Sequence, residues 1–122
     1  MDPTWVRALI IEEGSEQFGV VTIDAIGADS PLMTRAWEIA AGRGLTIPLE
    51  NIVMGGSHSH SGPGAISAWF LWSIAPATDL MVPELQTMLA TSIADALLTS
   101  QANLQPATLA IGPYQFARET GG

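Results

Sequence analysis

The sequence predicts an α/β fold, with elements in the order β-β-α-β-α-β in a layered arrangement. Short runs rich in apolar and β-branched residues predict strands, and two longer segments with apolar residues at helical spacing predict helices. Because strands connected through helices usually pair in parallel, we expect the sheet to be at least partly parallel. We expect residues 1–122 to form a single domain.

The first two strands are expected to form a β-hairpin. Residues 5–11 read WVRALII and residues 18–23 read FGVVTI, so both runs are dominated by residues that favour strands. The polar residues 12–16 between them include a glycine and predict the turn of this hairpin.

A helix is predicted to follow the hairpin. Ser30 and Pro31 predict its start, because serine can cap a helix N-terminus and proline suits the first helical position. Gly42 and Gly44 predict its end. Between these limits the apolar residues recur at helical spacing, at Leu32, Ala36, Ile39 and Ala40.

Two more strands are expected further along the chain. Residues 51–54 read NIVM and predict a short buried strand, and residues 107–111 predict a last strand. Residues 65–75 are compatible with a short helix or with a buried loop.

The second helix is predicted to begin at Pro83 and to end near Asn103. Gln86 and Asp95 are expected to lie outside its buried face. That face is expected to be an apolar stripe of Leu85, Met88, Leu89, Ile93, Ala96 and Leu97.

The composition excludes several classes of protein. The chain has no cysteine, which excludes a disulfide framework, a thiolate zinc site and a thiol nucleophile. Twelve acidic residues against four basic residues give a net charge of −8, which phosphate backbones would repel, so we expect no binding to nucleic acid. No run of about 20 apolar residues predicts a transmembrane helix, and the first residues do not resemble a signal peptide. The cellular location is left unassigned.

Residues 55–64, which read GGSHSHSGPG, are the segment with the clearest potential for chemistry. Both histidines of the chain, His58 and His60, lie in this segment, directly after a predicted strand. In extended backbone, residues at positions i and i+2 point to the same side, so both imidazoles can face one metal ion. Alternatively, one histidine binds the metal and the other transfers a proton or stabilises an oxyanion. A glycine-rich turn with two solvated histidines is the non-functional interpretation.

Other polar residues near this segment are second-shell or ligand candidates. The hydroxyl groups of Ser57 and Ser61 can orient the ring nitrogens of the histidines. Asp24 follows the strand over residues 18–23 and can act as a metal ligand, as a partner of a ligand, or as an ordinary turn residue. Ser61 lacks the strand–turn–helix setting of a serine nucleophile.

Trp69 and Trp72 lie in a segment that is apolar on every side. Such residues usually belong to a core. The functional interpretation is that they form a wall of a lipid-binding cleft, or a surface that other chain covers.

The segment Ser57-His58-Ser59-His60-Ser61-Gly62-Pro63-Gly64 resembles the signature His-Thr-His-Ser-Gly-Pro-Gly of the neutral/alkaline (non-lysosomal) ceramidase family. In that family the signature follows a strand similar to Asn-Val-Met-Ile, where this chain has NIVM at residues 51–54. Residues 2–8, DPTWVRA, look like the family's Asp-Pro-Leu-x-x-Arg-Ala strand, and residues 21–24, VTID, look like its Val-Ser-x-Asp. Ser59 stands where the family has threonine.

The resemblance implies a zinc-dependent amidase that cleaves the N-acyl bond of ceramide to give sphingosine and a fatty acid. It implies that His58 binds the zinc cofactor, that His60 lies in the active site, and that the substrate is a lipid of the ceramide class. Zinc would lower the pKa of a bound water and polarise the amide carbonyl.

The resemblance also implies that this chain is part of a longer enzyme, with residues 1–122 forming a single partial domain, a fragment of a larger α/β domain and the N-terminal portion of its catalytic domain. The family's other zinc ligands, a histidine, a glutamate and a tyrosine, lie further along than residue 122, and the chain has no third histidine. We therefore expect the isolated chain to bind zinc weakly, to be inactive, and to self-associate through exposed apolar surface. The alternatives are another metal-dependent hydrolase on the same scaffold, or a non-catalytic α/β module that pairs with a partner through residues 69–72.

Overall fold

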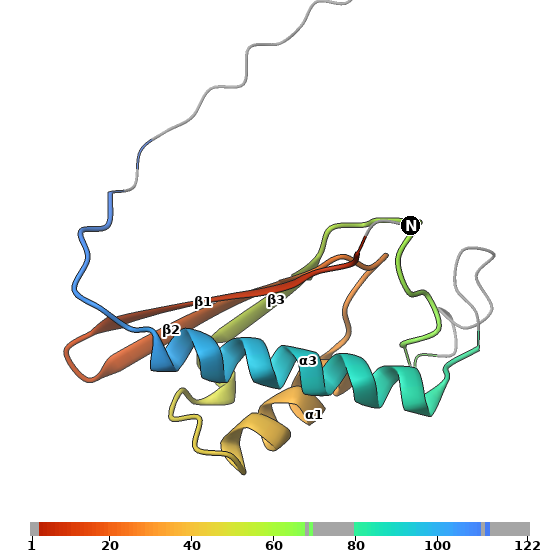
Figure 1. The fold of residues 1–122 in the computed structure, drawn as a ribbon, viewed down its shortest axis with the longest axis horizontal. Helices are drawn as coiled ribbons and strands as arrows, with labels where there is room; N and C mark the ends of the chain where they lie inside the picture. Colours follow the sequence, from red (N-terminus) through yellow and green to blue (C-terminus); the bar gives the residue numbers. More distant parts are fainter. Residues whose placement is uncertain (1–2, 68, 70–79, 111, 113–122) are drawn as a thin grey trace, which may run out of the picture.

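The computed structural model describes residues 3–67, 69, 80–110 and 112. They form a small α/β fold in which a three-stranded mixed sheet lies against two helices, so the predicted fold class is confirmed (Figure 1). Both helices cover the same face of the sheet. The elements are β1 (Val6–Glu13), β2 (Glu16–Ile23), α1 (Ser30–Ala41), a short 3-10 turn η1 (Leu49–Asn51), β3 (Ile52–Gly56) and α3 (Pro83–Ala102).

The hairpin of β1 and β2 is antiparallel and longer than predicted. Its register pairs Val6 with Ile23 at one end and Glu13 with Glu16 at the other. The turn is therefore only two residues long, because polar glutamates can continue a strand whose outer face is in water.

The connection from β2 through α1 to β3 makes the other half of the sheet parallel, as predicted. The register pairs Gly19 with Ile52 and Ile23 with Gly56. The two glycines after the predicted strand at residues 51–54 belong to β3, and Asn51 belongs to the turn η1 instead. Because β2 and β3 run in the same direction, the segments that follow Ile23 and Gly56 begin side by side.

Helix α1 begins and ends where the sequence predicts, but Ser30 is not its cap. Asp29 has extended backbone, and its Oδ1 accepts a hydrogen bond of 3.0 Å from the N–H of Leu32. Ser30 is the first helical residue. A carboxylate one residue earlier therefore satisfies a free N–H group of the first turn.

Helix α3 spans the predicted range, but its buried face differs from the predicted stripe. The side chain of Met88 is 61% exposed, whereas that of Gln86 is 6% exposed. The helix packs against both α1 and β1, and its buried face includes the small residues Ala90 and Ala94. The buried residues are Gln86, Ala90, Ile93, Ala94 and Leu97.

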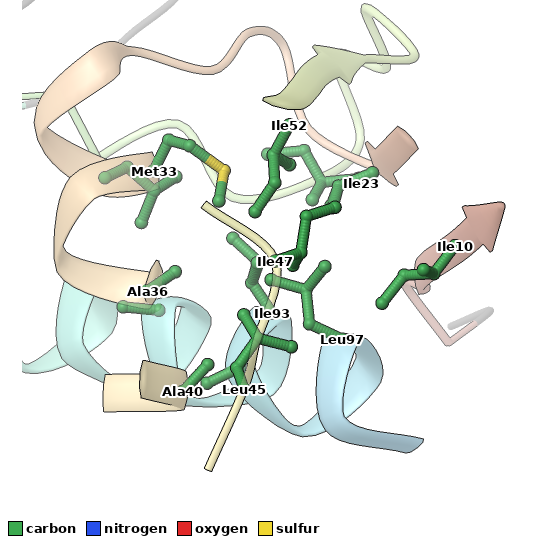
Figure 2. Close-up of a cluster of buried hydrophobic side chains, with 14 of the residues drawn as sticks. Ile10, Ile23, Met33, Ala36, Ala40, Leu45, Ile47, Ile52, Ile93 and Leu97 are labelled. Carbon is green, nitrogen blue, oxygen red and sulfur yellow. The ribbon is translucent and has the colours of Figure 1, made fainter. Parts of the chain in front are cut away.

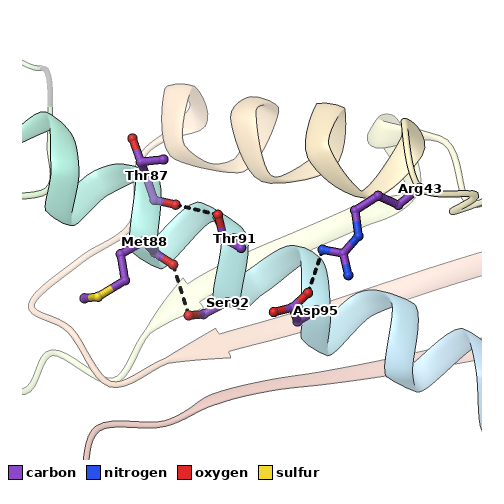
Figure 3. A network of polar contacts seen from close by, with 6 residues as sticks. All are labelled: Arg43, Thr87, Met88, Thr91, Ser92 and Asp95. Carbon is purple, nitrogen blue, oxygen red and sulfur yellow. Dashed lines mark hydrogen bonds and ion pairs between the residues drawn. The ribbon is translucent and has the colours of Figure 1, made fainter.

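The outer side of α3 carries hydroxyl groups that bond to its own backbone (Figure 3). The Thr91 hydroxyl donates to the Thr87 carbonyl at 2.9 Å, and the Ser92 hydroxyl donates to the Met88 carbonyl at 3.0 Å. Such bonds satisfy hydroxyl groups that would otherwise compete with the helix for backbone partners.

Arg43 and Asp95 form an ion pair of 2.6 Å that links the end of α1 to α3 (Figure 3). Both side chains are about half exposed, at 49% and 55%. Solvent therefore limits this pair to about 0–1 kcal/mol of stabilisation.

The core lies between the sheet and the two helices (Figure 2). Its largest fully buried side chains come from β2, α1, α3 and the segment between α1 and β3. The indole N–H of Trp37 donates to the Ile47 carbonyl at 3.0 Å and holds that segment in place. The fully buried side chains are Ile23, Leu32, Ile47, Ile93, Leu97 and Val21.

Two predictions about strands are wrong. Residues 107–110 form no strand and are exposed, although Ile111 lies outside the described residues. The β1 edge nearest to them is partly used by α3, because the Ile10 N–H donates to the Ser100 hydroxyl at 3.0 Å. Strand β3 is not fully buried either, because its side chains alternate between the two faces of the sheet: Ile52 is 9% exposed, whereas Val53 is 56% exposed.

The segment 65–75 is only partly described. Residues 65–67 and 69 form no helix, and Trp72 lies outside the described residues. In the part of the chain that the structure describes, neither helix has the length and hydrophobicity needed to cross a bilayer.

Candidate histidine site

The histidine segment leaves the sheet beside the end of β2. The Ser57 N–H donates to the Ile23 carbonyl at 2.9 Å, which continues the parallel pairing one step beyond β3. Gly56 lies against the segment after β2, because a Cβ atom there would come within 2.9 Å of the Ala25 carbonyl oxygen. A glycine is therefore needed for the two chains to approach this closely.

His58 has a backbone conformation that is uncommon for residues other than glycine. Its φ angle is +61°, the only positive φ of a non-glycine residue among the described residues. Its Nδ1 lies 2.8 Å from the Ile26 carbonyl oxygen. A carbonyl oxygen only accepts hydrogen bonds, so Nδ1 carries the proton in this contact, and in the neutral imidazole Nε2 keeps a lone pair. Metal-binding histidines typically have this arrangement.

His60 lies directly against His58. Their ring centroids are 4.9 Å apart and the rings are nearly perpendicular, at 85°. The two rings meet even though the backbone at His58 is left-handed rather than extended, so the extended geometry assumed from the spacing is wrong at this residue. The Ser61 N–H donates to the Ser59 hydroxyl at 3.3 Å within the same turn.

Asp24 lies beside the histidine segment through its backbone, while its carboxylate bonds to the start of the hairpin. Its Oδ2 accepts from the Trp5 N–H at 3.0 Å, and its Oδ1 lies 3.7 Å from the Arg7 guanidinium. A Cβ atom at Gly62 would collide with the Asp24 carbonyl oxygen, so the chain returns to the end of β2 at this glycine. Ser57 and Ser61 are both exposed at the ends of the turn.

A pocket of about 250 Å³ adjoins the segment that accepts the His58 hydrogen bond. Residues 26–30 form one wall, and Gly64, Ile66, Ser67 and Trp69 form the other. The Ser67 hydroxyl donates to Asp29 Oδ2 at 2.8 Å and joins the two walls. Trp69, a cleft candidate whose apolar segment is more typical of a core, lines this pocket and is 55% exposed, so it does not lie in the core.

Three residues that the sequence analysis did not select contribute to the site. Asp29 connects α1 to Ser67, and an aspartate before Ser-Pro is a capping signal that could have revealed it. Ile26 contributes to the His58 contact through its carbonyl, which no sequence pattern marks. Gln86, which helical spacing predicts outside the buried face, is buried and donates to the Ile66 carbonyl.

The histidine pair fits a metal site in part. Two neighbouring imidazoles, one of them with its Nδ1 proton already bonded, suit zinc chemically. Across the described ranges, however, no three side chains of the metal-binding types come together. Because a catalytic zinc usually has three protein ligands, these residues supply at most two of them.

The fold and the site thus define a small α/β structure with an exposed histidine pair at the carboxyl end of its parallel strands. Comparison with models of known families, with curated proteins and with solved structures finds no match to this chain.

Proposed function

We propose that this chain is part of a zinc-dependent amidase similar to the neutral ceramidases. The reaction would be hydrolysis of the N-acyl bond of ceramide to sphingosine and a fatty acid. The His58 contact carries the proposal, because its Nδ1 lies 2.8 Å from the Ile26 carbonyl oxygen and its Nε2 is thereby left as a ligand atom. The segment Ser57–Gly64, which resembles the family signature, is the second support.

The two histidines have different roles in this proposal. His58 holds the metal through Nε2, and the Ile26 carbonyl sets its tautomer and ring orientation. His60, whose ring lies 4.9 Å away, contacts the substrate and moves a proton or stabilises the developing oxyanion. A bound zinc ion would activate water and polarise the amide carbonyl.

Asp24 acts through the hairpin rather than on the metal. Its carboxylate is occupied by the Trp5 N–H and by Arg7, which fixes the carboxyl end of β2 beside the histidines. Trp69 and the neighbouring pocket offer an apolar surface for part of a lipid substrate. The remaining zinc ligands would come from outside the described residues, so the isolated chain binds zinc weakly and does not hydrolyse amides.

Zinc titration of the purified chain tests this proposal. We expect weak binding that falls at least about tenfold in His58→Ala, because a ligand is lost, and falls less in His60→Ala. Glu16→Gln, at the far end of the hairpin, is the matched control for zinc bound nonspecifically by this acidic chain.

Equal binding in the wild type and in both histidine variants, or no binding to the wild type, would contradict the assignment of His58. Amide hydrolysis is measured in a separate experiment. Hydrolysis of a short-chain ceramide by the isolated chain, lost in His58→Ala, would contradict the expected inactivity while supporting the metal role of His58.

A further inference from the structure

We infer that Gln86 is a positioning residue for the histidine pair, acting through the backbone of Ile66. The inference rests on the proposed function of the His58–His60 segment. Gln86 lies on α3, far from the histidines in sequence, and it touches neither of them in the contacts described above.

Gln86 is the only buried polar side chain among the described residues, at 6% exposure. Its Nε2 donates to the Ile66 carbonyl at 3.1 Å, and its Oε1 lies at the long distance of 3.5 Å from the Arg35 guanidinium. Burying an amide costs free energy unless it is hydrogen-bonded, a cost that an apolar side chain does not itself carry. Compared with an apolar side chain, the amide of Gln86 provides the hydrogen bond to the Ile66 carbonyl.

That hydrogen bond holds one end of the segment that carries the histidines. At the other end, the Ser57 N–H is fixed to the Ile23 carbonyl. Between the histidines and Ile66, Gly62 is packed against the Asp24 backbone. After Gly62, the Val82 N–H donates to the Ala65 carbonyl at 2.9 Å, directly before α3.

Gln86, in the first turn of α3, secures the next carbonyl. Two consecutive carbonyl groups, those of Ala65 and Ile66, are therefore held at the start of this helix. His58 and His60 lie in the short span between these fixed ends. The same bond also sets one wall of the pocket beside Ile26, because Ile66 and Ser67 line that wall.

Replacing the amide with an apolar group would leave the Ile66 carbonyl without this donor. Since Ile66 is 3% exposed, water cannot easily replace it, and the backbone of residues 64–67 must shift. We expect the shift to reach the turn at His58 and to weaken its contact with Ile26.

The test compares Gln86→Met with Gln101→Met. Gln101 is a matched control, because it lies on the same helix and its Nε2 also donates to a backbone carbonyl, that of Gly44, at 3.1 Å. It holds the segment between α1 and β3 instead of the histidine segment. Both variants should lower the melting temperature.

Only Gln86→Met should alter the histidines. The expected readout is the ¹⁵N signal of the His58 ring, recorded without metal. It should show the Nδ1–H tautomer in the wild type and in Gln101→Met, and a mixture of tautomers in Gln86→Met. Zinc affinity should fall about tenfold in Gln86→Met alone, the usual scale for a lost supporting contact.

An unchanged His58 signal in Gln86→Met, or the same change in Gln101→Met, would overturn the inference. If Gln86→Met does not fold, Gln86→Glu is the substitute, because it keeps the size of the side chain and removes the donor. The ¹⁵N signal of the His58 ring then tests the inference in that variant. The tautomer of His58 is measured without zinc. A wild-type chain that binds no zinc would therefore contradict the proposed function, while the His58 signal would still test the role of Gln86.

Discussion

His58 shows how a single residue combines local strain with a preorganised side chain. A left-handed backbone costs an L-residue about 1–2 kcal/mol. The hydrogen bond from Nδ1 to the Ile26 carbonyl offsets part of this cost, since such a bond contributes about 1 kcal/mol. Residues held in such conformations cluster at functional sites, where the strain fixes the position of a chemical group.

Substitution of His58 should separate backbone strain from metal binding. His58→Gly and His58→Ala both remove the imidazole, but glycine adopts φ +61° without strain, so we expect the glycine variant to be more stable by about 1 kcal/mol. Urea unfolding measures the difference. Both variants should lose the zinc affinity of the wild type.

The same pair of substitutions at Ser59 is the control. Ser59 does not have a positive φ, so alanine should be at least as stable as glycine there. An alanine variant at position 58 that is more stable than the glycine variant would show that His58 is not strained in solution.

At the scale of the element, α1 connects the fold to the site through its first turn. Asp29 caps the helix through Oδ1 and holds Ser67, a pocket residue, through Oδ2. One carboxylate therefore links helix stability to the pocket wall. The sequence predicts the start of this helix correctly but assigns the capping role to Ser30, because both residue types are common caps.

The two candidate caps can be distinguished by alanine substitution. Asp29→Ala should lower the free energy of unfolding by about 0.5–2 kcal/mol, because the Leu32 N–H loses its acceptor. Ser30→Ala should change it little, because Ser30 is an exposed residue inside the first turn. Thermal unfolding of both variants gives the comparison. A larger loss in Ser30→Ala would contradict the capping role of Asp29.

At the scale of the whole molecule, the fold has two layers and leaves one face of the sheet uncovered by described helices. Leu9 pairs with Val20, and Val20 pairs with Val53, so these side chains share the outer face with Phe18. Leu9, Phe18 and Val53 are 55%, 45% and 56% exposed. Apolar side chains that are adjacent on a sheet in this way favour contact with another surface.

We predict that the chain self-associates through this outer face. Its net charge of −8 opposes association, so salt should strengthen it by screening the repulsion. Sedimentation equilibrium should show a mass that rises above 12.8 kDa with protein concentration, and more so at high salt. Phe18→Ser combined with Val53→Thr should reduce association. Met88→Ser, which removes a 61% exposed methionine on α3, on the opposite side of the sheet, should not.

A monomer at every concentration and salt level would contradict this prediction. Association that persists in the Phe18 and Val53 variant would place the contact elsewhere on the molecule.

Local pattern determined much of this structure. The hairpin, both helices and the strand before the histidines follow from residue types and spacings that act over a few neighbours, and the fold class follows from their order. The spacing of His58 and His60 likewise identified them as candidates for chemistry before any geometry was known.

Tertiary structure decided the features that depend on contacts between distant segments. The rotation of α3 that buries Gln86 and exposes Met88 depends on how the helix packs against α1 and β1. The exposure of residues 107–110 depends on whether a partner strand is present, which the residue types of this segment cannot reveal. The tautomer of His58 depends on a backbone carbonyl 32 residues earlier in the chain. Because carbonyl groups are the same at every residue, only the folded backbone could bring that one to the imidazole.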